Sequence, residues 1–281
     1  MSEASPPELR PSEVGPPEGR RSDPPVLFEV DDDGIAHLTL NRPEAANALD
    51  LVLARALHEA TAEIAANETV RVVLLSGAGS RFCAGGDVRS FAGSGAGLGD
   101  ELGAVLAALH PTVELLAGLD APVVAAVQGS AAGAGLALVA GADLVVAAAS
   151  TKFVMAYTGI GLVPDGGSTW YLPRVIGMRR ALELALTNRV LSAAEACEWG
   201  LVTQVVDDAD VAEVAQALAA TLAAGASRAL GSAKQLMRTS LGSTLDAQLA
   251  HEATRMVLAG GSEDGREGVA AFVEKRPPAF S

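Results

Sequence analysis

The sequence predicts an α/β protein whose core contains parallel strand pairs and is followed by a C-terminal helical subdomain. Short runs of β-branched residues and leucine alternate with longer amphipathic stretches, a pattern typical of a parallel sheet covered by helices. The last third of the chain is rich in alanine and leucine and has a largely helical pattern. The 281 residues, 49% of them hydrophobic, are sufficient for a sizeable buried core.

The expected elements begin at residue 26. The runs Val26 to Val30 and Ile35 to Leu40 flank an Asp-Asp-Asp-Gly sequence, which predicts a hairpin. A helical face follows Asp50, and Ser192 and Glu195 have the spacing of a capping box at a helix start. The other expected elements are strands over 71–76, 122–127 and 144–147, and helices over 102–116, 211–224 and 227–241.

Composition divides the chain into three parts. Residues 1–25 hold seven of the fourteen prolines and almost no large apolar side chains. Such a segment cannot bury enough surface to offset the entropy of ordering, so a disordered proline-rich tail is expected. Residues 26–205 are expected to form the α/β core, and residues 206–281 the helical region.

Charge, cysteine content and hydropathy exclude several classes of function. The net charge of −14 and the scarcity of aromatic residues argue against a nucleic-acid partner. The two cysteines form no Cys-x-x-Cys pair, so neither a disulfide framework nor a metal site is expected, and the cytoplasm is the expected location. No secretory signal and no uncharged apolar run of 18 residues is visible, so no membrane partner is expected.

Two glycine-rich loops follow predicted strands. The first is Phe82 to Asp87, and the second is Gln128 to Gly135, which opens a predicted helix. Small residues let backbone N–H groups approach a ligand, and a helix N-terminus favours negative charge. Two such donors on one oxygen would form an oxyanion hole, each worth about 10²–10³ in rate. Neither loop fits a P-loop or a dinucleotide fingerprint, and tight packing is an alternative reason for the glycines.

Several motifs in a fixed order connect these loops to a known family. They are Asn-Arg-Pro from residue 41 with Asn-Ala-Leu from residue 47, then FCAGGD, PVVAAVQGSAAGAG, IGLVPDGGSTWYLPRVIG, LTNRVLSAAEACEWGLV and EDGREGVAAFVEKRPPAF. Over residues 26–281 this series resembles the enoyl-CoA hydratase/isomerase (crotonase) superfamily. The resemblance implies a crotonase-like ββα spiral core, a helical region that mediates oligomerisation, and homotrimers or dimers of trimers. It also implies an acyl-CoA thioester substrate and no cofactor, because coenzyme A is part of the substrate.

Matching positions in the motifs assign candidate binding groups by resemblance. The oxyanion donors would be the N–H groups of Gly86 and Ala134, whereas Asp87 would cap the next helix. Arg42, Arg81 and Lys275 are candidate partners of the CoA phosphates, although each is equally expected as a solvated surface charge. The full set expected to contact coenzyme A is Arg42, Ala45, Asn47, Ala84, Gly85 and Lys275.

The chain departs from the hydratases of the superfamily at both of their catalytic glutamates. The first glutamate position falls on Ala137 and the second on Tyr157. Neither residue is a carboxylate, so hydration by a pair of glutamates is not expected. Both are instead expected to line the acyl pocket, and Tyr157 could also donate a hydrogen bond.

Asp165 and His110 are the remaining candidates for the chemistry. Asp165 occupies the position of a catalytic aspartate in aromatic acyl-CoA dehalogenases and in isomerases resembling the phenylacetate-pathway enzyme. A carboxylate in an apolar pocket has a raised pKa and can shuttle a proton, although an Asp before Gly-Gly is also a good helix cap or turn residue. His110 precedes Pro122 by twelve residues, where the dehalogenases place a histidine that activates water, but a structural histidine is equally expected.

Three functions follow from these residues. The leading hypothesis is an acyl-CoA-transforming enzyme, an isomerase or a lyase, in which an oxyanion hole holds an enolate and Asp165 transfers the proton. The first alternative is a dehalogenase or hydrolase in which Asp165 attacks an acyl- or aroyl-CoA and His110 directs water. The second alternative is an acyl-CoA-binding protein without catalytic activity, which the missing glutamates suggest.

Overall fold

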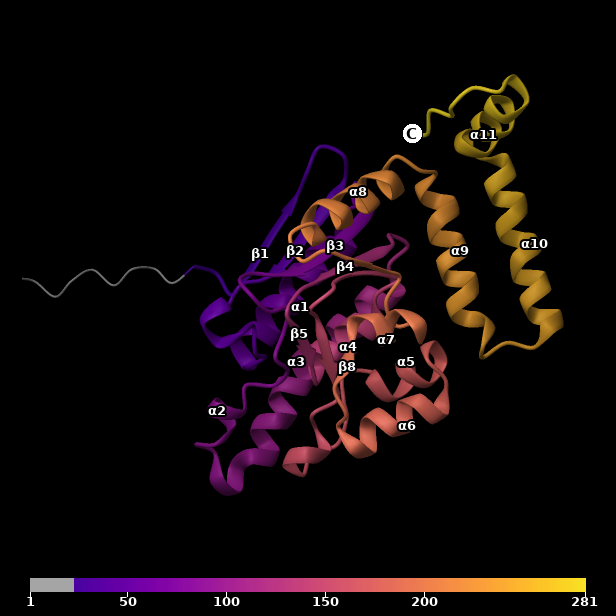
Figure 1. The fold of residues 1–281 in the computed structure, drawn as a ribbon. Helices are drawn as coiled ribbons and strands as arrows, with labels where there is room; N and C mark the ends of the chain where they lie inside the picture. Colours follow the sequence, from indigo (N-terminus) through magenta and orange to yellow (C-terminus); the bar gives the residue numbers. More distant parts are fainter. Residues whose placement is uncertain (1–22) are drawn as a thin grey trace, which may run out of the picture.

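A six-stranded sheet organises the computed structural model, which describes residues 23–281 (Figure 1). Of the tail predicted over residues 1–25, residues 1–22 therefore lie outside the described part of the chain. The sheet order is β1-β2-β3-β4-β6-β9, with β1 antiparallel to β2 and the other pairs parallel, which confirms the predicted α/β core. The strands are β1 (Val26–Val30), β2 (Ile35–Leu40), β3 (Val72–Gly77), β4 (Val123–Val127), β6 (Leu144–Ala148) and β9 (Gln204–Val206).

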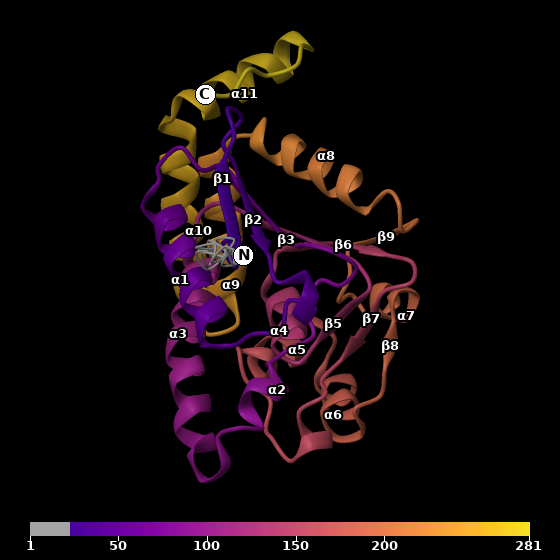
Figure 2. The same ribbon diagram turned by 90° about the vertical axis from the view of Figure 1, so that its left-hand side faces the viewer.

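Helices cover both faces of this sheet (Figure 2). On one face, α1 (Leu51–Ala66) and α3 (Leu98–Gly118) pack in the larger apolar core. On the other face, α8 (Val211–Ala223) presents buried residues four apart to β3, β4 and β6. All five side chains of β4 are buried, as expected for a parallel strand between two layers. Thus α8, which lies in the region 206–281 predicted to be helical, packs on the sheet and completes the core.

A second, smaller sheet was not predicted. It contains β5 (Ser130–Ala132), β7 (Lys152–Val154) and β8 (Leu191–Ser192) in the order β5-β7-β8. It contacts α4 (Ala134–Gly141) and α7 (Ala193–Glu198), and the Ser192–Glu195 capping box at the start of α7 is present as predicted. The other short helices are α2 (Val88–Phe91), α5 (Ser168–Val175) and α6 (Met178–Thr187).

The last three helices form a C-terminal arm, α9–α11, that projects from the core (Figure 1). They are α9 (Ser227–Ser240), α10 (Leu245–Gly261) and α11 (Glu263–Glu274), and α10 has no buried residue. No helix in the described part of the chain is long and apolar enough to cross a membrane.

One aspartate anchors the arm to the core. Lys234 Nζ lies 2.9 Å from Asp143 Oδ2, and Arg238 Nη2 lies 2.6 Å from Asp143 Oδ1. Asp143 Oδ2 also accepts a hydrogen bond from the backbone N–H of Val123 at 2.8 Å. The Lys234 side chain is nearly buried and donates to two backbone carbonyls as well. Burial lowers the pKa of Lys234 by more than the neighbouring Asp143 carboxylate raises it, so the charge depends on these partners.

Candidate active site

The two glycine loops meet at the carboxyl ends of β3 and β4. The backbone N–H of Cys83 donates to Ser130 O at 3.1 Å, and the N–H of Ala132 donates to Cys83 O at 2.9 Å. A Cβ at Gly135 would lie 2.6 Å from Cys83 O, so only glycine permits this approach. The loops therefore form one unit, whose relative position depends on backbone hydrogen bonds.

The predicted oxyanion donors both belong to this unit. Hydrogen bonds from Leu49 N to Gly85 O (2.7 Å) and from Asp87 N to Leu49 O (2.8 Å) fix the backbone around Gly86. Ala134 is the first residue of α4, so its N–H has no acceptor within the helix. Neither Gly86 nor Ala134 donates a backbone hydrogen bond to any described residue, and both line the same cavity. Their N–H groups are free to donate to a ligand.

The cavity next to these donors has a volume of about 180 Å³ and mainly apolar walls. One wall consists of four residues of α3 that have the spacing i, i+3, i+4 and i+7, namely Leu102, Val105, Leu106 and Leu109. This helical periodicity is visible in the sequence, but it does not by itself distinguish a cavity wall from a packed core. Ala84 and Gly85, which are predicted to contact coenzyme A, line the cavity. The other main lining residues are Phe91, Met155, Tyr157, Leu162, Val163 and Asp165.

Asp165 has the only charged side chain among the described residues that line this cavity. Tyr157 Oη donates a hydrogen bond to Asp165 Oδ1 at 2.5 Å. Burial raises the pKa of Asp165, and the hydrogen bond from Tyr157 and the nearby charge of His110 lower it by less. Burial and the negative charge of Asp165 raise the pKa of Tyr157, so the phenol remains a proton donor.

The alternative helix-capping role of Asp165 is wrong. The N-cap of α5 is Gly167, and no side chain caps that helix. Only the backbone carbonyl of Asp165 takes part in the turn, where it accepts from the N–H of Ser168 at 3.0 Å. The carboxylate is left to the cavity and to Tyr157.

Two predicted site residues lie outside the cavity wall. His110 is an exposed residue of α3 and does not line the cavity, although its charge influences the pKa of Asp165. Ala137 is buried in α4 and does not line this cavity, and a Cβ built at Gly166 would lie 3.0 Å from the Ala137 Cβ. Ala137 therefore packs against the loop before α5, and its predicted contact with an acyl group stays a prediction.

The Arg42 side chain forms ion pairs and a hydrogen bond with other protein groups. Its guanidinium lies 3.0 Å from Asp50 and 3.3 Å from Asp87, and it donates to Ala48 O at 2.7 Å. Asp87 caps α2 by accepting from the N–H of Ser90, which confirms its predicted structural role. Two carboxylates beside Arg42 disfavour a phosphate there, so the structure gives Arg42 a structural role, and its predicted contact with a CoA phosphate stays a prediction.

The other predicted CoA contacts are also not gathered at the cavity. Asn47 is fully buried, and its Nδ2 donates to Ala78 O at 2.9 Å and Arg81 O at 2.8 Å, so its role is structural. Ala45 is half-buried in a short 3-10 helix and does not line the cavity. Lys275 ends α11, at the opposite end of the molecule from α2 and α3 (Figures 1 and 2).

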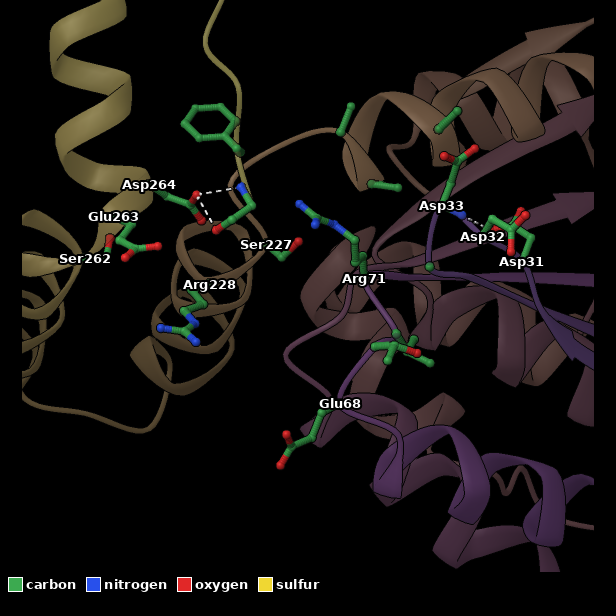
Figure 3. Close-up of a pocket in the computed structure, with 18 of the residues that line it drawn as sticks. Asp31, Asp32, Asp33, Glu68, Arg71, Ser227, Arg228, Ser262, Glu263 and Asp264 are labelled. Atoms are coloured by element: carbon green, nitrogen blue, oxygen red, sulfur yellow. Dashed lines mark hydrogen bonds between the residues drawn. The ribbon is translucent and has the colours of Figure 1, made fainter.

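A larger cleft of about 1180 Å³ lies between the β1–β2 turn and the C-terminal arm (Figure 3). Its lining includes six acidic side chains (Asp31, Asp32, Asp33, Glu68, Glu263 and Asp264) but only three arginines (Arg71, Arg228 and Arg266). This excess of negative charge disfavours an anionic ligand such as coenzyme A. The cleft is also at the amino end of the parallel strands, whereas ligands of α/β sheets bind at the carboxyl end. Across residues 23–281, no group of three or more His, Cys, Asp and Glu side chains is suited to a metal ion.

Comparisons with known proteins agree with the fold. A family model described as "Enoyl-CoA hydratase/isomerase" matches residues 31–281. The chain is 46% identical to a 1,2-epoxyphenylacetyl-CoA isomerase from Escherichia coli K12, over 91% of this chain and 98% of that protein. It is 32% identical to a 4-chlorobenzoyl coenzyme A dehalogenase from Arthrobacter sp, over 86% and 88%. A crystal structure of an enoyl-CoA hydratase from Polaromonas sp. JS666 superimposes with a TM-score of 0.86 at 35% identity, over 91% and 99%.

Proposed function

Since the chain belongs to the enoyl-CoA hydratase/isomerase family, a family of enzymes that act on acyl-CoA thioesters, we propose that it is an acyl-CoA isomerase whose proton carrier is Asp165. The observation that carries this proposal is the isolation of Asp165 as the charged group of an apolar cavity beside two free backbone N–H groups. Hydration by paired glutamates has no counterpart here, because Ala137 and Tyr157 occupy those positions.

The proposed reaction moves one proton between two carbons of the acyl group. The thioester oxygen accepts hydrogen bonds from Gly86 N and Ala134 N, which stabilises an enolate. The Asp165 carboxylate removes a proton from the carbon α or γ to the thioester carbonyl and returns it to the other carbon, so the double bond shifts. Burial raises the pKa of Asp165, which brings it closer to the working pH and favours both removal and return of the proton.

Similarity to the isomerase supports an acyl group with an apolar body. That relative is named for 1,2-epoxyphenylacetyl-CoA, whose phenyl-derived ring is uncharged. The cavity walls here are mainly aliphatic, with Phe91 and Tyr157 as aromatic contributions and no basic side chain among the described lining residues. We propose that the substrate is a thioester with an uncharged acyl group and that coenzyme A within it is the only non-protein group required.

Turnover of an acyl-CoA panel by the full chain tests the proposal. The panel contains β,γ- and α,β-enoyl-CoA isomers and 1,2-epoxyphenylacetyl-CoA, with products identified by mass spectrometry. We expect isomer formation and exchange of deuterium at the α or γ carbon, and a loss of about 10²–10⁴ in kcat in Asp165→Asn. Circular dichroism of the variant should match that of the parent.

Two other outcomes would reject the proposal in distinct ways. Halide release from 4-chlorobenzoyl-CoA without carbon-bound exchange would identify the aspartate-nucleophile alternative. Binding of acyl-CoA without turnover, unchanged in Asp165→Asn, would identify an acyl-CoA-binding protein.

We also propose that the C-terminal arm mediates assembly into a homotrimer or a dimer of trimers. Its helices expose an unusual number of large apolar side chains for surface elements, which favours burial against another copy. Analytical ultracentrifugation should give three or six copies, and a monomer would reject this assignment. The exposed residues are Met237, Leu241, Leu245, Leu249, Met256, Val257, Leu258, Val269, Phe272 and Val273.

A further inference from the structure

We infer that Tyr157 is a positioning residue that determines which oxygen of Asp165 carries the proton. The inference deepens the isomerase proposal and rests on it. Its basis is the hydrogen bond of 2.5 Å from Tyr157 Oη to Asp165 Oδ1, within a cavity that both residues line.

The Tyr157 ring is held in place by its surroundings. The side chain is buried, and its Cζ atom lies 3.6 Å from the position of a Cβ at Gly133. Its backbone carbonyl accepts from the N–H groups of Ile160 and Leu162, each at 3.1 Å. Because Gly133 directly precedes the proposed oxyanion donor Ala134, the phenol connects the proton carrier to the loop that would hold the thioester oxygen.

The hydrogen bond gives the two carboxylate oxygens of Asp165 different roles. Burial and the Asp165 charge raise the pKa of Tyr157, so the phenol donates throughout the reaction rather than ionising. Asp165 Oδ1 is thus occupied as an acceptor, whereas Oδ2 has no hydrogen-bond partner among the described side chains. Oδ2 takes the proton from carbon and returns it, while Tyr157 holds the carboxyl group in a single orientation.

A pH profile of Tyr157→Phe tests this role, with Tyr171→Phe as the matched control. The two tyrosines are the only ones in the chain and are equally exposed, at 8%, and the Tyr171 hydroxyl has no hydrogen-bond partner among the described residues. The Tyr157 hydrogen bond lowers the pKa of Asp165, so its loss should move the acidic limb of kcat/KM upward by about one pH unit. We expect kcat to fall about tenfold with KM nearly unchanged, because the freed carboxylate samples unproductive orientations.

The result that overturns the inference is a pH profile of Tyr157→Phe that coincides with the parent profile. A loss of activity without a pH shift, shared by Tyr171→Phe, would assign Tyr157 a purely packing role. If Tyr157→Phe did not fold, Tyr157→His, which retains an N–H donor, should restore part of the kcat if donation is what matters.

An absorption measurement at neutral pH separates this inference from the isomerase proposal. In Tyr171→Phe, Tyr157 is the one remaining tyrosine, so changes in tyrosine absorption report its surroundings alone. Adding Asp165→Asn replaces the charged acceptor of the Tyr157 hydroxyl with a neutral one and should shift the tyrosine absorption band in a difference spectrum. An unchanged band would disprove the pairing, whether or not any substrate is turned over. Conversely, if Asp165→Asn lost turnover while the band and the pH profile of Tyr157→Phe both stayed unchanged, the proposed function would stand and the inference would be rejected.

Discussion

Two aspartates of this chain are partly buried in opposite electrostatic surroundings. Asp143, between α4 and β6, contacts the cations Lys234 and Arg238 and one backbone N–H. Asp165, before α5, contacts the uncharged hydroxyl of Tyr157 and faces an apolar cavity.

The difference explains why one aspartate is structural and the other is the candidate for chemistry. Cations and N–H donors stabilise the ionised form of a carboxylate, so it serves as a fixed charge that holds elements together. A carboxylate without a cation partner in an apolar site has a raised pKa, as Asp165 has, and is therefore a better proton acceptor than an ordinary carboxylate. The same residue type is thus assigned two roles by its neighbours.

Asp143→Ala should cause the largest change. The substitution leaves Lys234, which is nearly buried, and Arg238 without their carboxylate partner. Removing one member of a buried ion pair costs about 3–5 kcal/mol, because the remaining charges are uncompensated. Urea denaturation should show this loss in the free energy of unfolding, with Arg276→Ala, at an exposed ion pair, as a control that changes little. A loss below about 1 kcal/mol would show that Asp143 does not anchor the C-terminal arm.

Asp165→Asn should have a smaller and opposite effect on stability. Since burial raises the pKa of Asp165 in the folded state, its favourable contribution is present at acid pH and is lost as pH rises through that pKa. At neutral pH the ionised carboxylate therefore weakens the fold. The neutral amide should raise the free energy of unfolding by about 0.5–2 kcal/mol at neutral pH, the range typical of a single stabilising substitution.

The pH dependence checks the sign of this effect. Thermal unfolding of Asp165→Asn and the parent chain should converge as the pH is lowered, because Asp165 is then protonated in both folded and unfolded chains. A variant that is less stable at neutral pH would mean that Asp165 is stabilised as an anion, as Asp143 is.

The strands and helices could be predicted well because their signals are local. The hairpin strands are observed at Val26–Val30 and Ile35–Leu40, as predicted from their alternation and the turn between them. The β5-β7-β8 sheet was missed, since strands of two or three residues are too short to show a periodicity. The role of α8 in the core was missed because its alanine-rich face does not indicate which surface it covers.

The site could be predicted only where motif position determines it. Gly86, Ala134, Tyr157 and Asp165 do meet at one cavity, as their positions in the motifs implied. The ion pairing of Arg42 could not be predicted from the sequence, because one of its partners, Asp87, is 45 residues away and is brought near by the fold. Side chains that bind a ligand and side chains that bind distant backbone have the same local signature.

His110→Ala should have the smallest effect, and it tests whether any ionisable group besides Asp165 takes part in the chemistry. His110 is exposed, and it is the smallest of the influences that lower the pKa of Asp165, because water and salt screen an exposed charge. Its removal should raise the pKa of Asp165 slightly and change kcat at neutral pH by less than about threefold, as should the control His251→Ala in exposed α10. In a mechanism where His110 activates water against an aspartyl ester, the same variant would instead lose about 10²–10⁴ in kcat, with hydrolysis of the covalent intermediate as the slow step. Steady-state rates of both variants, with mass spectrometry for an ester on Asp165, distinguish a carboxylate that carries a proton from one that attacks carbon.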